Sequence, residues 1–181
     1  MKPDYLKGCG LAFMSALLWG VSGTFGQFLF AHRGVNTEWL VAVRMLTAGI
    51  LMLGFVALRT PRDLFAIWTD RRDALRMAIF GLFGMLAVQY TYFAAINASN
   101  AATATVIQYT GPVLIVGWFA LQKKRWPTPF EFLCVGMAIA GTFFMVTHGS
   151  LNSLSISTMA LVWGLSSAVA LAFYSIQPLS L

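Results

Sequence analysis

The sequence predicts an all-α protein, a polytopic bundle of six transmembrane helices. Hydrophobic residues make up 59% of the chain and charged residues only 10%, whereas soluble domains average about 45–50% and about 25%. The charges cluster in short segments between long apolar runs. Uncharged helical runs of about 20 residues are long enough to cross a hydrocarbon layer about 30 Å thick. We therefore expect the lipid bilayer to surround most of this chain.

The six predicted spans follow one another at short intervals. The first is not a cleaved signal peptide, because its apolar run of 22 residues exceeds the roughly 7–15 residues of a signal core. The fourth span contains a central proline, and the fifth is the shortest. The spans are predicted at residues 9–30, 39–58, 77–96, 101–121, 132–147 and 156–176.

Charges in the connecting segments predict the orientation. With the N-terminus inside, ten Lys and Arg residues fall in cytoplasmic segments and only Arg33 falls outside, a bias typical of the cytoplasmic side. We predict a multi-pass protein of a cell membrane, either a plasma membrane or a bacterial inner membrane, with a cytoplasmic N-terminus. This bias explains the net charge of +6 without nucleic acid as a partner. The longest connection is expected to contain a short surface helix from Pro61.

The fourth span combines polar residues with a proline near its midpoint. Pro112 has no N–H, so the carbonyl of Gln108, four residues earlier, loses its helical partner. At membrane depth, such a carbonyl is tolerated only beside protein or a water-filled cavity. Discontinuous helices build binding sites in many transporters, and a kink that serves helix packing is an equally weighted alternative. The short connection at residues 97–100 makes the third and fourth spans a hairpin.

Polar and aromatic side chains at mid-depth are the candidates for a substrate pathway. Gln89 and Tyr92 lie one helical turn apart, as do successive candidates of the fourth span. For each candidate, a hydrogen bond that only joins two helices is the competing explanation. The candidates are Trp19, Ser22, Gln89, Tyr92, Thr105, Gln108, Pro112, Trp163 and Ser166.

Arg44 is the one basic residue within a predicted span. At the centre of a span, arginine costs about 2.5–3.5 kcal/mol on insertion scales. Arg44 lies toward the outer end of the second span, so we expect it to snorkel outward. The alternative is that it faces the bundle, where it would contact an anion or serve a structural role.

The sixth span resembles the first and indicates an internal repeat. Residues 16–30 align with residues 160–174 at an offset of 144. Because five spans are an odd number, a second unit would start in the inverted orientation, which is a common transporter design. The coinciding positions include Trp19/Trp163, Gly20/Gly164 and Ser22/Ser166.

This repeat predicts two units in the chain. Residues 1–150 would form one complete five-helix repeat, and residues 151–181 would begin a second, truncated repeat. After Glu131 no Asp, Glu, Lys or Arg occurs up to the last residue, although a span that enters the cytoplasm normally has Lys or Arg close behind it. We therefore expect the chain to be a fragment of a longer protein.

Three stretches carry a family resemblance: LLWG at 17–20, the arginine-containing VAVRMLTAG, and the hairpin AINASNAATATVIQYTGPVLIVGWFAL. In these stretches the chain resembles the EamA family, the ten-span branch of the drug/metabolite transporter superfamily. The likeness covers one full repeat and the first span of the next. It implies a permease that moves small metabolites or drugs by alternating access. One departure is at residues 122–125, where the family's usual acid is absent.

Two alternatives come from other functional classes. Residues 20–23 match the GxSG pattern of rhomboid-like intramembrane serine proteases, but the histidines, His32 and His148, are predicted at outer ends, away from Ser22. A non-transporting assembly subunit is the second alternative. With no HExxH, P-loop or dinucleotide motif, we expect no enzyme activity, metal or cofactor. The expected partners are a small-molecule substrate, the lipid bilayer, and either a second copy or a missing second half.

Overall fold

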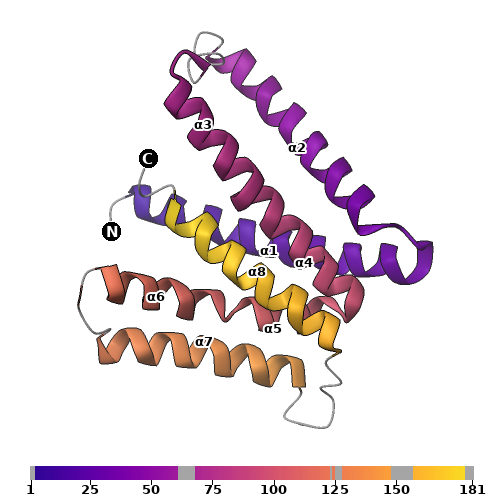
Figure 1. Ribbon diagram of the computed structural model, residues 1–181, viewed down its shortest axis with the longest axis vertical. Helices are drawn as coiled ribbons and strands as arrows, with labels where there is room; N and C mark the ends of the chain where they lie inside the picture. The colour runs from indigo at the N-terminus through magenta and orange to yellow at the C-terminus, as the bar shows by residue number, and fades with distance from the viewer. Residues whose placement is uncertain (1–2, 61–67, 123, 125–127, 148–156, 178–181) are drawn as a thin grey trace.

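The computed structural model describes residues 3–60, 68–122, 124, 128–147 and 157–177, and these residues are almost entirely helical (Figure 1). Within these ranges the chain contains no strand, so the predicted all-α class is confirmed. The predicted surface helix at Pro61 lies outside the described residues. In chain order the elements are α1 (Pro3–Arg33), α2 (Thr37–Arg59), α3 (Arg71–Ile79), η2 (Phe80–Leu86), α4 (Ala87–Ala98), α5 (Ala101–Gln108), α6 (Gly111–Gln122), α7 (Pro129–Thr147) and α8 (Thr158–Ile176).

Five helical stretches of the described chain are long and apolar enough to cross a membrane, which confirms a polytopic helix bundle. The predicted fifth span corresponds to α7, a helix of 19 residues that starts three residues earlier than expected. The predicted third span is part of a longer helix that begins at Arg71. The five stretches are Leu6–Arg33, Thr37–Arg59, Arg71–Ala98, Ala101–Gln122 and Thr158–Ile176.

Side-chain caps mark where α5 and α8 begin. Asn100 Oδ1 accepts a hydrogen bond of 2.8 Å from the N–H of Thr103 at the start of α5. Ser157 Oγ accepts one of 3.1 Å from the N–H of Ala160 at the start of α8. Both bonds satisfy amides that have no partner inside the helix. Ser157 also donates to the carbonyl of Ala98, so the start of α8 is joined to the end of α4.

The third span contains a π-helical segment that the sequence analysis did not predict. The segment η2 lies between α3 and α4. There, buried Gly84 faces Tyr174 of α8, whose ring stacks on Phe80 at 5.2 Å between centroids. π-Helical turns are rare and often occur near functional sites. This one lies directly before the residues of α4 that form the candidate site.

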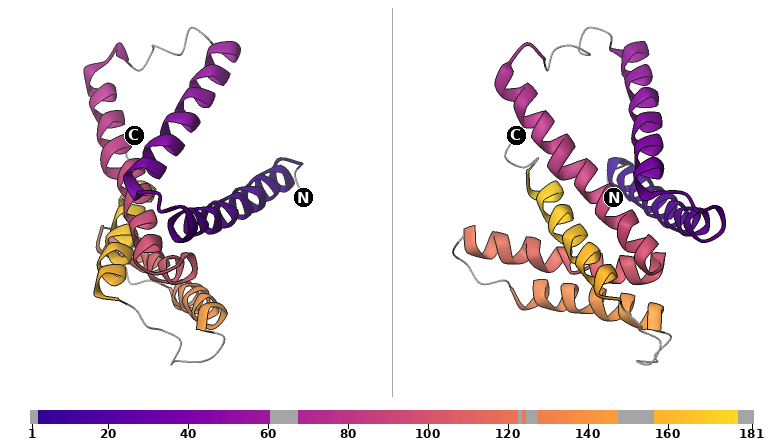
Figure 2. Two further views of the ribbon diagram at one scale, coloured as in Figure 1. Left: turned by 90° about the vertical axis from the view of Figure 1, so that its right-hand side faces the viewer. Right: turned by 45° about the vertical axis from the view of Figure 1, so that its right-hand side comes forward.

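The core of the bundle is built around α4, which contacts α1, α2, α5 and α8. Phe93, Ala95 and Ile96 of α4 are each at most 2% exposed. The far ends of α1 and α2 extend away from this core (Figure 2). Because α4 touches helices from both predicted units, it positions side chains that meet at their boundary.

Candidate functional site

Three of the hydrogen-bonded pairs of polar side chains that join helices around α4 contain residues singled out from the sequence. One pair links α1 to α2, one links α4 to α5, and one links α5 to α8. Inside a membrane, such bonds hold helices together and also satisfy polar groups that have no access to water. We call them the polar pairs: Ser22–Arg44, Tyr92–Thr105 and Gln108–Ser167.

Arg44 is half-buried and points toward α1 and α4, so the expectation that it snorkels outward is wrong. Its Nη1 donates to Ser22 Oγ, and its guanidinium carbon lies 4.5 Å from the centroid of the Phe93 ring. The face of an aromatic ring attracts a cation, and a hydroxyl accepts one of its N–H groups. These two contacts keep the charge inside the bundle. Among the described residues, no carboxylate forms an ion pair with Arg44.

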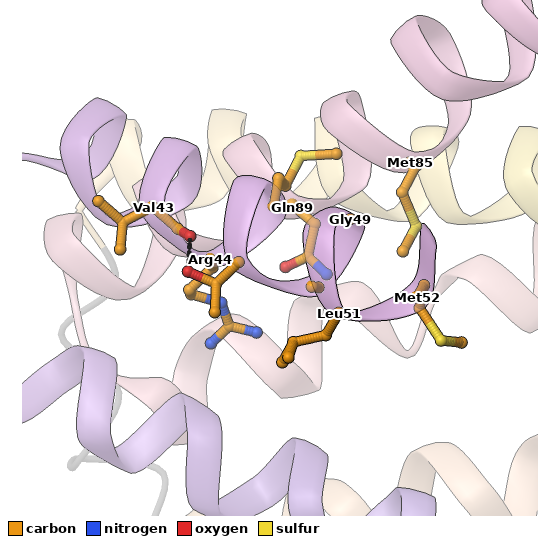
Figure 3. A pocket seen from close by; sticks show the side chains of 10 residues that line it. Val43, Arg44, Gly49, Leu51, Met52, Met85 and Gln89 are labelled. Atoms are coloured by element: carbon orange, nitrogen blue, oxygen red, sulfur yellow. Dashed lines mark hydrogen bonds between the residues drawn. The ribbon is translucent and has the colours of Figure 1, made fainter. Parts of the chain in front are cut away.

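Arg44 also lines a cavity of about 640 Å³ between α2 and the segment that contains η2 and α4. Gln89 reaches the same cavity from α4, and Figure 3 shows its amide near the stretch of α2 that carries Arg44. The Thr47 hydroxyl donates a hydrogen bond of 2.7 Å to the carbonyl of Val43 on the same helix (Figure 3). The other lining residues are apolar: Val43, Met45, Ala48, Gly49, Leu51, Met52 and Met85.

Tyr92 connects α1, α4 and α5. Its hydroxyl is 2.9 Å from Thr105 Oγ1, and its ring centroid is 5.8 Å from that of Trp19. A Cβ at Gly23 would come within 3.2 Å of the Tyr92 hydroxyl, so α1 passes close to this side chain. The fold thus brings together three predicted candidates, Trp19, Tyr92 and Thr105.

Trp163, the predicted counterpart of Trp19, packs on a different tyrosine. Its ring meets Tyr90 edge-on at 5.5 Å between centroids, and the Tyr90 hydroxyl donates to Glu38 Oε1 at 3.1 Å. Tyr90 and Tyr92 are two residues apart, which places them on opposite sides of a helix. The likeness between α1 and α8 therefore extends to how each packs its tryptophan on α4.

The helix of the fourth span breaks just before Pro112, where a disruption was predicted. Tyr109 and Thr110 form a turn between α5 and α6. The N–H of Thr110 donates to the carbonyl of Ile107 at 3.1 Å, a three-residue step that tightens the chain. Pro112 follows in the first turn of α6, where its missing N–H is tolerated.

Gln108 lies buried at this break and faces α8. Its Nε2 donates to Ser167 Oγ at 2.7 Å, and Ser167 is fully buried. Sequence reasoning missed Ser167 and selected Ser166, which instead lines a separate cavity with Thr91. The repeat alignment carried no signal for Ser167, because its offset of 144 residues pairs it with Gly23.

Three of the predicted pathway residues, Gln89, Tyr92 and Gln108, each contact a different part of the bundle. Gln89 lines the Arg44 cavity, Tyr92 bonds to α5, and Gln108 bonds to α8. Gln89 and Tyr92 are three residues apart, but their side chains reach different neighbours because α2 and α5 flank different parts of α4. The structure thus places these three side chains against three different neighbours.

Comparison with known proteins places this architecture in a family. The profile of the EamA-like transporter family matches residues 6–147. The chain belongs to this family. It is also 40% identical over 172 residues to YicL of Salmonella typhimurium, whose name is "uncharacterized inner membrane transporter". That alignment covers 95% of the chain and 57% of YicL, so the chain spans little more than half the length of this curated relative. No solved structure matches the chain.

The EamA-like match ends at Thr147, where α7 ends, so α8 lies beyond it. The resemblance inferred from the three sequence stretches is confirmed. The multi-pass membrane location is confirmed as well, because the family and the five apolar helices agree.

The rhomboid-like alternative finds no support in this EamA-like chain. Ser22 is bonded to Arg44, whose guanidinium stays protonated and cannot serve as a general base. His32 stacks on Phe28 at 4.6 Å between ring centroids. The second histidine, His148, lies outside the described residues.

Proposed function

We propose that this protein is a secondary transporter that moves small polar or amphipathic metabolites across the cell membrane by alternating access. The observation that carries the proposal is the helix break at Tyr109 and Thr110, beside the buried Gln108–Ser167 pair. The family and the name of YicL support transport as the general activity. Discontinuous helices that meet at a boundary between repeats are a recurring feature of transporter binding sites.

The break gives the fourth span two parts that can tilt separately. A turn without continuous helical bonds bends more easily than an intact helix. α5 is joined to α4 through Tyr92 and Thr105, and both α5 and α6 pack against α7 and α8. Tilting at the break would change the Gln108–Ser167 contact and alter access along α8. This is the element we propose to switch between the inward-open and outward-open states.

Alternating access needs a second unit, and we propose that α8 is its first helix. In the most apolar windows of α1 and α2, only 6% and 11% of residues are buried within the chain. These faces require lipid or further helices around them, because apolar surface is unfavourable in water. We propose that a second repeat, or a second copy of the chain, covers part of them and completes the pathway.

The test is transport by the full-length protein in proteoliposomes. The vesicles would be loaded with a defined mixture of amino acids, carboxylates, amides and nucleosides, and the loss of each solute would be followed by mass spectrometry. For at least one solute, Pro112→Ala and Gln108→Ala should each lower the initial rate about tenfold, the effect of about 1.4 kcal/mol. Loss of the turn, or of the bond to Ser167, would disturb the switching element.

Two substitutions serve as matched controls for this transport test. Pro129→Ala changes a proline that begins α7, and Gln122→Ala changes an exposed glutamine at the end of α6. Both should keep the wild-type rate at equal protein content. If no solute leaves faster than from protein-free vesicles, the proposed function is rejected. If both Pro112→Ala and Gln108→Ala transport normally, the break is not the switching element.

The proposed orientation is tested by cysteine labelling in intact cells. Cys9 and Cys134 would first be replaced by alanine. A cysteine at Arg72 should then react with an impermeant maleimide only after permeabilisation, because the basic segment is predicted to be cytoplasmic. A cysteine at Ser99 should react from outside. Labelling of position 72 in intact cells would reverse the assigned topology.

A further inference from the structure

We propose that the Arg44 cavity binds the carboxylate of an amphipathic organic anion, and that such anions are the substrates of this protein. The inference rests on the proposed transport function, because it names the chemical class that the pathway accepts. It uses the first polar pair, Ser22–Arg44, together with Phe93 and the cavity between α2 and α4.

The first argument is the unbalanced charge of Arg44. A guanidinium has five N–H donors and remains charged in proteins, and in this structure Ser22 accepts from Nη1. No carboxylate of the described chain neutralises it. A charge within a span is expensive, and charged residues inside spans often mark substrate or ion pathways. A carboxylate bound side-on would accept two hydrogen bonds from N–H groups of the Arg44 guanidinium and compensate its charge.

The second argument is the cavity that Arg44 lines. Its volume of about 640 Å³ falls within the about 300–1,000 Å³ typical of small-molecule sites. Three methionines, Met45, Met52 and Met85, line it, and their flexible thioethers adapt to apolar groups of different shapes. Gln89 adds an amide that can bond a second polar group of the ligand. A charged end beside Arg44 and an apolar body among the methionines fit these walls.

The third argument is the position of Phe93. The ring is 1% exposed and lies 4.5 Å from the guanidinium carbon, so it holds the charged group on this side of α2. Because the Phe93 ring and Ser22 hold the guanidinium before any ligand arrives, less conformational entropy is lost when a ligand binds. Arg59, by contrast, lies over Phe55 on the same helix but at its exposed end.

The experiment measures binding and does not depend on transport. Full-length protein in a neutral detergent free of anionic lipid would be titrated with hexanoate and with hexanamide, which has the same apolar body and no charge. Binding would be followed by calorimetry and by the unfolding temperature. We expect millimolar binding of hexanoate and at least tenfold weaker binding of hexanamide. Equal binding of the two probes would overturn the proposal.

Substitutions at Arg44 test whether this residue recognises the charge of hexanoate. Arg44→Gln should weaken hexanoate binding at least tenfold, and Arg44→Lys should retain part of it, because an ammonium keeps the charge but loses the bidentate geometry. Arg59→Gln is the matched control and should bind as the wild type does. An equal loss in Arg59→Gln would show nonspecific attraction and reject the site.

A second variant pair covers the case in which Arg44→Gln does not fold. Gly49 lines the cavity and has open space around it, as does Gly54 on the same helix away from the cavity. Gly49→Leu should fill the cavity and lower hexanoate affinity at least fivefold, whereas Gly54→Leu should not. Unchanged affinity in Gly49→Leu would contradict binding in this cavity.

Two further measurements distinguish a lipid headgroup from a free carboxylate as the bound anion. They also distinguish failure of the anion inference from failure of the transport function. Phosphatidylglycerol that displaces hexanoate, with no carboxylate transported in vesicles, would assign the site to lipid headgroups and overturn the substrate inference. Transport restricted to neutral solutes would reject the anion class and leave the transport function standing. Hexanoate binding without transport of any solute would reject the transport function and with it the substrate claim, and would leave only the carboxylate site.

Discussion

Gly164→Leu is expected to destabilise the bundle by about 3 kcal/mol or more, at or above the top of the range for overpacked cores. A Cβ at Gly164 would already lie 2.6 Å from Ile107 Cγ2 and 2.8 Å from its Cβ. Ile107 is itself buried, so it has little room to move, and α5 and α8 would have to separate. Separation would also break the nearby Gln108–Ser167 bond. The measurement is the SDS fraction at which tryptophan fluorescence reports unfolding in mixed micelles.

The predicted internal repeat supplies the matched control for Gly164→Leu. Gly20 occupies the corresponding position of α1, yet a Cβ there would meet no atom within 4 Å. Gly20→Leu should therefore unfold at the wild-type SDS fraction. If both variants unfold at the same SDS fraction, the close crossing of α5 and α8 does not stabilise the protein.

Phe93→Ala should lower stability by about 3–5 kcal/mol, the usual effect of emptying a buried aromatic position. The ring is 1% exposed, meets Phe30 edge-on at 6.2 Å between centroids, and fills the space left by Gly26. Its removal also takes away the aromatic face beneath Arg44, worth about 0.5–2 kcal/mol. The same SDS titration measures the change.

Phe55→Ala separates burial from the cation–ring contact. Phe55 also lies beneath an arginine, with Arg59 5.3 Å from its centroid, but it is 57% exposed. Its loss should change stability by less than about 0.5 kcal/mol, as for most exposed positions. A loss as large as that of Phe93→Ala would show that the cation–ring contact, and not burial, is what stabilises these positions.

The helical spans and the break could be predicted because their causes are local. Apolar length alone indicates a membrane helix, and a proline removes one backbone donor wherever it stands. Both arguments held for α2 and for the turn before Pro112. The cap of α5 by Asn100 follows from side-chain chemistry in the same way.

The direction of Arg44 could not be predicted, because two environments compete for it. Its position near the outer end of the second span favoured snorkelling. Only the way α1 and α4 pass α2 brings Ser22 and Phe93 within reach of Arg44. Ser167 is a similar case, since nothing within α8 distinguishes it from Ser166. Its role depends on the angle at which α5 passes α8 and brings Gln108 opposite.

The sequence by itself determined that this is a multi-pass helical membrane protein of the EamA-like family, with a helix broken before Pro112. Those properties depend on composition, run length and a single proline, which act along the chain. The tertiary structure alone decided which polar side chains meet: Arg44 with Ser22, Tyr92 with Thr105, and Gln108 with Ser167. The physical reason is that each pair spans two helices. Their meeting depends on crossing angles set by small residues such as Gly23 and Gly164, which no periodicity within one helix records.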